Sequence, residues 1–222
     1  MKVGSQKWKD LITNGAKIMK IDISREKTDQ FAIHAEELIK WNKKVNLTAI
    51  TDPFEVAVKH YLDSIYPAHL VPSNASMLDI GSGGGFPGIP LKILIPSLSV
   101  TLIDATRKKV SFLKHVIRTL ELQNIKARHI RGEELADESN VGETFDVIIS
   151  RAFGSLNDFL IESLPLLSRS GILLAMKGKA IGDEVEAINS TISKYRLSLA
   201  LEKYTLPYLG SKRSIIVLRD LN

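Results

Sequence analysis

The chain contains no cysteine among its 222 residues. Disulfides, thiolate metal sites and a cysteine nucleophile are therefore excluded together. Its five histidines are scattered and show neither the H-E-x-x-H pattern nor another paired ligand spacing, so we expect no metal site. Long apolar runs are also missing, because no stretch approaches the roughly 20 residues that cross a bilayer. The N-terminal residues lack the apolar core of a signal peptide. We expect a cytoplasmic protein with no membrane partner.

Charge of one sign is only mildly in excess, with 30 Lys plus Arg against 25 Asp plus Glu and a formal net charge of +5. The cations are clustered, however, at Lys40, Lys43 and Lys44, at Arg107–Lys109, and at Lys177, Lys179, Lys212 and Arg213. Three cations at the start of a helix oppose its dipole, which favours a role in binding for the second cluster. The pattern favours an anionic partner such as nucleic acid, and a solvated charged face is the alternative for each cluster.

A glycine-rich loop follows a short apolar run and is the most informative stretch present, M-L-D-I-G-S-G-G-G-F-P-G. Glycines tolerate positive φ, so the backbone can turn sharply and let a ligand lie against its amides. The D-x-G-x-G-x-G spacing is associated with S-adenosylmethionine enzymes, and it assigns cofactor contacts to Asp79, Gly81, Gly83 and Gly85. Gly83, Gly85 and Gly88 also satisfy G-x-G-x-x-G, so the loop alone does not separate methyl transfer from hydride transfer. A flexible linker is the structural alternative.

A second apolar run, V-T-L-I-D-A, ends in Asp104 about 20 residues after the glycines. Both classes of nucleotide enzyme place a carboxylate there to accept the two ribose hydroxyls. We therefore predict that Asp104 binds a ribose. The alternative role is that of N-cap for the helix that starts near Thr106, and both roles are compatible.

The order of apolar and charged segments predicts an α/β protein with a Rossmann-like, mostly parallel sheet of seven strands behind an N-terminal helical extension. Residues 1–70 are expected to be helical, with Thr28 as a helix cap, and residues 71–222 to form the ligand-binding domain. Alternation of strands and helices predicts a sheet covered on both faces, and two late strands predict an antiparallel hairpin at one edge. The expected strands are 76–80, 100–105, 125–130, 145–150, 171–176, 197–206 and 214–219, and the expected helices after residue 70 are 88–95, 107–121, 156–167 and 182–194. The hairpin ending is typical of methyltransferases and favours S-adenosylmethionine over a nicotinamide cofactor.

Ligands of such sheets bind beyond the carboxyl ends of the strands. The candidate positions are therefore Gly81–Phe86, Asp104–Thr106, Arg131–Glu134, Ser150–Phe153 and Met176–Lys179. We predict that the Gly132 amide and the Glu133 carboxylate contact an adenine edge and that Phe86 packs on the cofactor. A solvated loop acid and a core aromatic are the respective alternatives.

The fourth strand exit, F-D-V-I-I-S-R-A-F, lacks the N-P-P-Y or D-P-P-Y motif that binds an exocyclic amine, and the chain has no cysteine for attack on a pyrimidine. An acceptor that is already nucleophilic, such as guanine N7, fits what remains, because it needs alignment and no general base. Arg151 is predicted to orient the base or the cofactor carboxylate, with a structural ion pair as the alternative. His60 and Asp63, three residues apart, are expected to form a capping or packing pair, with a place in the lining of the cofactor cleft as the alternative.

Several segments together resemble the bacterial 16S ribosomal RNA guanine-N7 methyltransferases, the family of small-subunit methyltransferase G, also called glucose-inhibited division protein B. They are D-I-G-S-G-G-G-F-P-G-I-P-L, the run I-S-R-A-F-x-S-L-N-D, A-M-K-G-K, N-L-T-A-I and H-Y-L-D-S. The similarity extends from about residue 30 to the C-terminus. It implies a class I S-adenosylmethionine-dependent methyltransferase that modifies N7 of a guanine, family position 527, in the small-subunit decoding region.

The resemblance also implies cofactor contacts at Gly81, Phe86, Asp104, Ala105, Thr106, Gly132, Glu133 and Arg151. The expected partner is 16S ribosomal RNA or a small-subunit particle, bound by a monomer. Phosphate contacts are predicted for Lys108, Lys109, Lys177, Lys212 and Arg213, which lie beside the strand exits. Two other classes stay open: an NAD-dependent oxidoreductase, for which no proton-handling group is evident, and a non-catalytic RNA-binding module, which would not need the glycine loop and Asp104 together.

Overall fold

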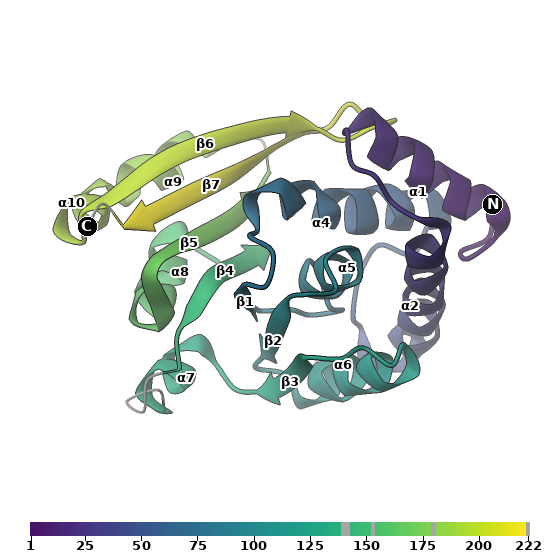
Figure 1. The fold of residues 1–222 in the computed structure, drawn as a ribbon, viewed down its shortest axis with the longest axis horizontal. Coiled ribbons are helices and arrows are strands. Elements are labelled where there is room, and N and C mark those ends of the chain that lie inside the picture. Colours follow the sequence, from purple (N-terminus) through teal and green to yellow (C-terminus); the bar gives the residue numbers. More distant parts are fainter. Residues whose placement is uncertain (139–142, 152–153, 179–180, 221–222) are drawn as a thin grey trace.

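The computed structural model describes residues 1–138, 143–151, 154–178 and 181–220 (Figure 1). One seven-stranded sheet forms its centre, in the order β3-β2-β1-β4-β5-β7-β6. The strands are β1 (Ser76–Ile80), β2 (Ser99–Asp104), β3 (Ile125–His129), β4 (Phe145–Arg151), β5 (Leu167–Lys177), β6 (Leu197–Thr205) and β7 (Lys212–Asp220). The predicted seven-stranded α/β arrangement is confirmed.

Strands β1 to β6 run in one direction, and β7 pairs antiparallel with both β5 and β6. The predicted terminal hairpin is thus confirmed, with β6 at the edge and β7 inserted next to β5. β1 pairs with β2 on one side and with β4 on the other, so the order of the strands reverses at β1. Parallel sheets of this kind bind ligands at the carboxyl ends beside the reversal. Residues Met77–Ile80 are all buried, as expected for a strand covered on both faces.

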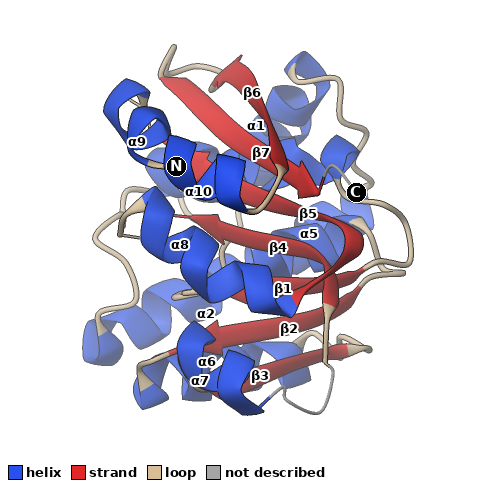
Figure 2. Ribbon diagram, turned by 90° about the vertical axis from the view of Figure 1, so that its left-hand side faces the viewer, coloured by secondary structure: helices blue, strands red, loops and turns tan. Residues whose placement is uncertain are grey.

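Helices cover both faces of the sheet. In Figure 1 the N-terminal helices lie with α5 and α6 on one side, and Figure 2 shows α8, α9 and α10 in front of the sheet with α5 behind it. The helices are α1 (Gln6–Ile18), α2 (Arg25–Val45), α3 (Pro53–Glu55), α4 (Asp63–Ile65), α5 (Gly88–Leu94), α6 (Arg107–Thr119), α7 (Gly132–Glu138), α8 (Leu156–Ser163), α9 (Gly182–Ala187) and α10 (Asn189–Lys194). A π-helical segment, η1 (Val56–Leu62), and two 3₁₀ turns, η2 (Tyr66–Leu70) and η4 (Leu164–Leu166), complete them.

The N-terminal extension packs directly on the sheet's helical layer. α2 contacts both α5 and α6, and α1 contacts η1. The fully buried side chains of Trp8, Phe31 and Leu62 share one hydrophobic cluster with Phe112 of α6 and Met77 of β1. The extension therefore shares its apolar core with the α/β part, while the proposed domain boundary at residue 70 stays a prediction.

Several predicted boundaries are wrong. Ser24 caps α2, since its hydroxyl accepts a hydrogen bond from the Lys27 amide, whereas Thr28 is buried inside the helix and its hydroxyl donates to the Arg25 carbonyl. The helix expected over 182–194 is two helices that meet at Ile188. β5 starts four residues earlier than expected. Three of its first four residues, L-S-R-S, are polar, so the apolar pattern predicts only the later part of the strand. Helix α7 was not predicted, since G-E-E-L-A-D-E has no helical period of apolar residues.

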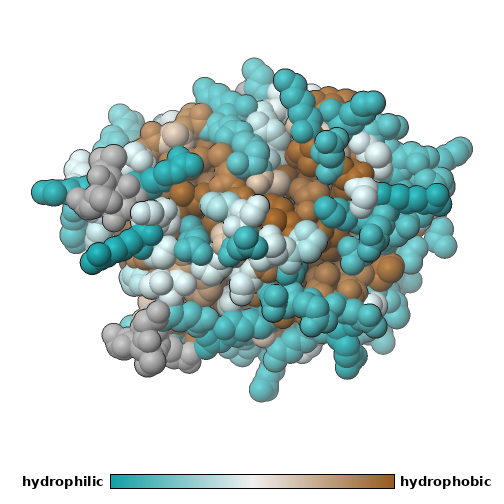
Figure 3. Space-filling model, viewed as in Figure 1, coloured by the Kyte–Doolittle hydropathy of each residue, from teal (hydrophilic) through white to brown (hydrophobic). Residues whose placement is uncertain are grey.

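No helix within the described ranges is both long and apolar enough to cross a membrane. Over the same residues, no group of three or more histidine or acidic side chains is placed to hold a metal ion. On the face shown in Figure 3, hydrophobic residues gather in the middle and hydrophilic side chains surround them. An apolar area with a polar rim is typical of a surface that binds a ligand or partner.

Candidate functional site

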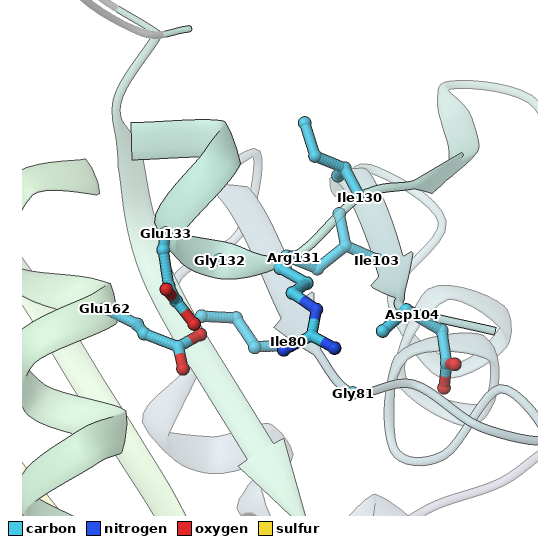
Figure 4. Close-up of a pocket in the computed structure, with 10 residues that line it drawn as sticks. Ile80, Gly81, Ile103, Asp104, Ile130, Arg131, Gly132, Glu133 and Glu162 are labelled. Atoms are coloured by element: carbon cyan, nitrogen blue, oxygen red, sulfur yellow. The ribbon is translucent and has the colours of Figure 1, made fainter. Parts of the chain in front are cut away.

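A cavity of about 210 Å³ lies at the carboxyl ends of β1, β2 and β3 (Figure 4). Its wall brings together five of the predicted cofactor positions, Gly81, Asp104, Ala105, Gly132 and Glu133. In Figure 4 the Asp104 side chain lies on one side of the cavity, and the carboxylate of Glu133 lies on the other. The three strand exits therefore converge as the sequence predicts.

The glycine loop after β1 forms one edge of this cavity. Gly81, Gly83 and Gly85 have φ of +74°, +55° and +89°, a region that residues with a Cβ rarely adopt. The amides of Gly81 and Ser82 both donate to the Ile103 carbonyl, at 3.0 Å, which attaches the loop to the end of β2. A side chain at Gly81 or Gly83 would meet no atom closer than 3.9 Å, so the loop borders open space there. The backbone is thus shaped for a ligand to approach closely.

Asp79 lies under the loop and is completely buried. Its Oδ2 accepts a hydrogen bond of 2.8 Å from the Gly88 amide at the start of α5, and its Oδ1 has no hydrogen-bond partner among the described residues. Burial raises the pKa of Asp79 to about 7. Asp79 does not line the cavity in this structure, and its contact with a cofactor stays a prediction.

Asp104 connects the two loops that border the cavity. Its Oδ2 accepts from the Gly83 amide at 3.0 Å, and its Oδ1 accepts from the Thr106 amide at 2.8 Å. The N-cap residue of α6 is Thr106, so the alternative that Asp104 is the N-cap of this helix is wrong. A carboxylate offers about four lone pairs, so Asp104 can accept further hydrogen bonds from a ligand.

Replacement of Asp104 by alanine is expected to weaken binding of S-adenosylmethionine by about 1.5–3 kcal/mol, the range for a hydrogen bond to a charged group. Isothermal titration calorimetry measures this directly. Asp104→Asn should lose less, because one amide oxygen still accepts. Asp146→Ala is the matched control, since Asp146 also accepts from a backbone amide, that of Ser76, but at the opposite end of the strands. Unchanged affinity with a lowered melting temperature in Asp104→Ala would limit Asp104 to a structural role.

A second cavity, of about 450 Å³, adjoins the exits of β4 and β5. It is lined by Ile50, Lys59, His60, Asp63, Arg151, Met176, Lys177, Gly178, Tyr204 and Arg213. His60 and Asp63 thus line this second cavity and not the one that holds the predicted cofactor positions, so a role in the cofactor cleft stays a prediction. Asp63 is held by the Tyr204 hydroxyl at 2.7 Å, and Arg151 and Arg213 approach it at 3.6 Å. Ala152, Phe153 and Lys179, which were among the predicted exits, lie outside the described residues.

Phe86 is buried and lines neither of the two cavities. Its ring stacks on His60, with centroids 4.4 Å apart and planes 13° apart, and the Arg151 guanidinium lies 5.1 Å from its centroid. This environment matches the alternative of a core aromatic, and a direct contact with a cofactor stays a prediction.

Glu162 of the first cavity was not predicted as a site residue. It reaches the cavity from α8, whereas Arg131 belongs to the predicted strand exit Arg131–Glu134. Burial, and after it the charge of Glu133, raises the pKa of Glu162. In Figure 4 the two carboxylates lie close together. Glu162 carries no local sequence signal, because only the packing of α8 on α7 brings it to the strand exits.

The predicted phosphate contacts differ in their surroundings. Lys108 and Lys212 are exposed. The other three approach carboxylates: Lys109 lies 3.8 Å from Asp104, Lys177 lies 2.6 Å from Glu184, and Arg213 approaches Asp63. The exposed pair therefore offers the most direct test of RNA binding.

Comparison with known proteins places this chain in a family. A family model described as rRNA small subunit methyltransferase G matches residues 27–215. Proteins called ribosomal RNA small subunit methyltransferase G are similar over most of the chain. The one from Geotalea uraniireducens (strain Rf4) is 44% identical over 96% of this chain and 97% of its own length, and the one from Geobacter sp. (strain M21) is 40% identical over 96% and 98%.

Solved structures at low identity share the fold. An O-methyltransferase from Bacillus cereus in complex with SAH has a TM-score of 0.63 at 14% identity and covers 97% of this chain and 99% of its own. NSun6 from Pyrococcus horikoshii with SFG has a TM-score of 0.59 at 16% identity and covers 73% of this chain and 53% of its own. The predicted Rossmann-like methyltransferase architecture is confirmed.

Proposed function

This chain belongs to the rRNA small subunit methyltransferase G family, and we propose that it transfers the methyl group of S-adenosylmethionine to N7 of a guanine in 16S ribosomal RNA. The observation that carries the proposal is the cavity that joins Gly81, Asp104 and Glu133 at the strand exits of a chain in this family. The proposal includes a monomer that acts in the cytoplasm on the RNA or on a small-subunit particle.

The residues of the first cavity suit S-adenosylmethionine. Asp104 has lone pairs left for two ribose hydroxyls, and the Gly132 amide and Glu133 carboxylate can address the adenine edge. The open space beside Gly81 and Gly83 leaves room for the ligand against the backbone. When bound, this cofactor supplies an electrophilic methyl group on a sulfonium.

Guanine N7 suits the second cavity as the methyl acceptor, because its methylation needs no general base. Guanine N7 carries a lone pair and no proton at neutral pH, so its bond to the methyl group forms as the sulfur–methyl bond breaks. The positive charge passes from sulfur to the guanine ring, and no proton is released. Burial, together with the charge of Arg151, lowers the pKa of His60 to about 3. His60 is therefore neutral at pH 7, and the protein's task is to align the reactants and exclude water.

Methylation of 16S RNA, and of small-subunit particles, from a strain lacking this enzyme tests the function. We expect one methyl group per RNA, mapped to N7 of one guanine, and binding of S-adenosylmethionine but not NAD. A methyl group on another atom, or binding of NAD in its place, would contradict the proposal.

Replacement of Lys108 or Lys212 by glutamine is expected to weaken RNA binding. The fall of the logarithm of the association constant with the logarithm of salt concentration should become less steep by roughly 0.7–0.9 per phosphate contact, because fewer counterions are released. S-adenosylmethionine affinity should stay constant. Lys17→Gln, an exposed position on α1, is the matched control. Binding titrations at several salt concentrations measure these slopes. Identical slopes in parent and variants would assign both lysines to a solvated face.

A further inference from the structure

The side chain of Arg151 is surrounded by one segment of the N-terminal extension, Lys59–Ser64. The guanidinium donates to the Lys59 carbonyl at 2.9 Å and to the Ser64 hydroxyl at 3.4 Å, and Asp63 Oδ2 lies 3.6 Å away. A further contact of 3.1 Å joins its Nη2 to Nδ1 of His60. Backbone, hydroxyl, carboxylate and imidazole acceptors thus enclose a group whose side chain is only 18% exposed.

The contact with Arg151 fixes the protonation of His60. A guanidinium only donates hydrogen bonds, so Nδ1 of His60 must accept and its ring proton must sit on Nε2. Nε2 lies 2.9 Å from the hydroxyl oxygen of Thr48, to which it donates. The low pKa of His60 agrees with this neutral tautomer. Thr48, His60 and Arg151 therefore form one directed chain of hydrogen bonds.

The same imidazole also touches the glycine loop. Its ring stacks on Phe86, which follows Gly85 directly in the chain. Arg151 lines the second cavity, and Phe86 belongs to the loop beside the first. His60 thus contacts both the predicted orienting group, Arg151, and the glycine loop, through the ring of Phe86.

We propose that His60 is a positioning residue for methyl transfer, which holds the Arg151 guanidinium in the orientation that aligns the guanine with the methyl group. The inference rests on the proposed function. A fixed guanidinium loses little rotational freedom when the acceptor binds, and small misplacements of an aligning group slow a reaction strongly.

Two amide substitutions distinguish the role of Nδ1 of His60 as an acceptor from the role of Nε2 as a donor. In asparagine, Oδ1 is as many bonds from Cβ as Nδ1 of histidine, so His60→Asn retains an acceptor for Arg151. In glutamine the amide nitrogen corresponds to Nε2, so His60→Gln retains the donor to Thr48 and loses that acceptor. His69→Gln, on η2 and paired with Glu202, is the control for loss of a histidine elsewhere in the extension.

Single-turnover methylation of 16S RNA at saturating S-adenosylmethionine gives the readout. His60→Gln is expected to be slowed about tenfold or more, His60→Asn to stay within about threefold of the parent, and His69→Gln to match it. Thermal unfolding is measured for each. Equal rates for the asparagine and glutamine variants would overturn the proposal, including when both are slow.

A double-mutant cycle with Arg151→Lys tests whether His60 acts through Arg151. We expect the effect of His60→Gln to disappear largely in the Arg151→Lys background, since residues that share one interaction are not additive. Fully additive effects would show an independent structural role and overturn the inference. A parent enzyme that fails to methylate 16S RNA would instead contradict the proposed function, which keeps the two failures distinct.

Discussion

Gly83→Val is expected to abolish binding of S-adenosylmethionine, with an affinity loss of at least about 100-fold, because a β-branched residue disfavours positive φ and its side chain would fill the ligand's space. Gly83 has φ of +55°, and a Cβ there would point into open space, where only the Gly81 carbonyl oxygen lies within 4 Å. Its amide also donates to Asp104, so a shift of the backbone would disturb the proposed ribose site as well. Isothermal titration calorimetry on the folded variant measures the effect.

Gly210→Val provides the control for backbone strain. Gly210 has φ of +64° in the turn between β6 and β7, and a Cβ there would also meet nothing within 4 Å. We expect a comparable fall in melting temperature and an unchanged cofactor affinity. Retained binding in folded Gly83→Val, or equal loss in both variants, would remove the glycine loop from the cofactor site.

Features that depend on neighbouring residues could be predicted from the sequence. The apolar run up to Ile80, the glycines after it and Asp104 at the end of the next strand are local signals, and parallel strands bring their exits together. The same rule placed Gly132 and Glu133 correctly beside Gly81. Helix α7 escaped because its acidic sequence has no apolar period, although its first two residues were recognised as site candidates.

Features that depend on packing between distant segments could not be predicted. Asp63 and Tyr204 are 141 residues apart in sequence, and only the hairpin of β6 and β7 brings the hydroxyl to the carboxylate. The burial of Phe86 likewise depends on η1, which places His60 on its ring. The ion pair of Lys177 with Glu184 depends on where α9 lies, so a cation that looks available in the sequence is already paired.

Arg151→Lys is expected to slow the chemical step of methyl transfer by about 100-fold, because an ammonium cannot reproduce the planar fork of the guanidinium. Arg151 donates to Lys59, His60 and Ser64 at once, in directions that one ammonium on a shorter reach cannot match. Single-turnover rates at saturating S-adenosylmethionine and RNA isolate this step from binding.

The pH dependence of that step separates alignment from base catalysis. His34 and His60 have pKa values lowered by burial to about 4 and about 3, so both stay neutral from pH 6 to 8.5. Asp79, with its pKa of about 7, ionises within this window. Because the cofactor is saturating, an effect of this ionisation on cofactor affinity does not change the measured rate. Since guanine N7 loses no proton, the rate should be flat across the window in the parent and, at a lower level, in Arg151→Lys. A single-proton limb that one substitution at a residue other than Asp79 removes would mean that the acceptor must be deprotonated, and N7 would then be the wrong atom.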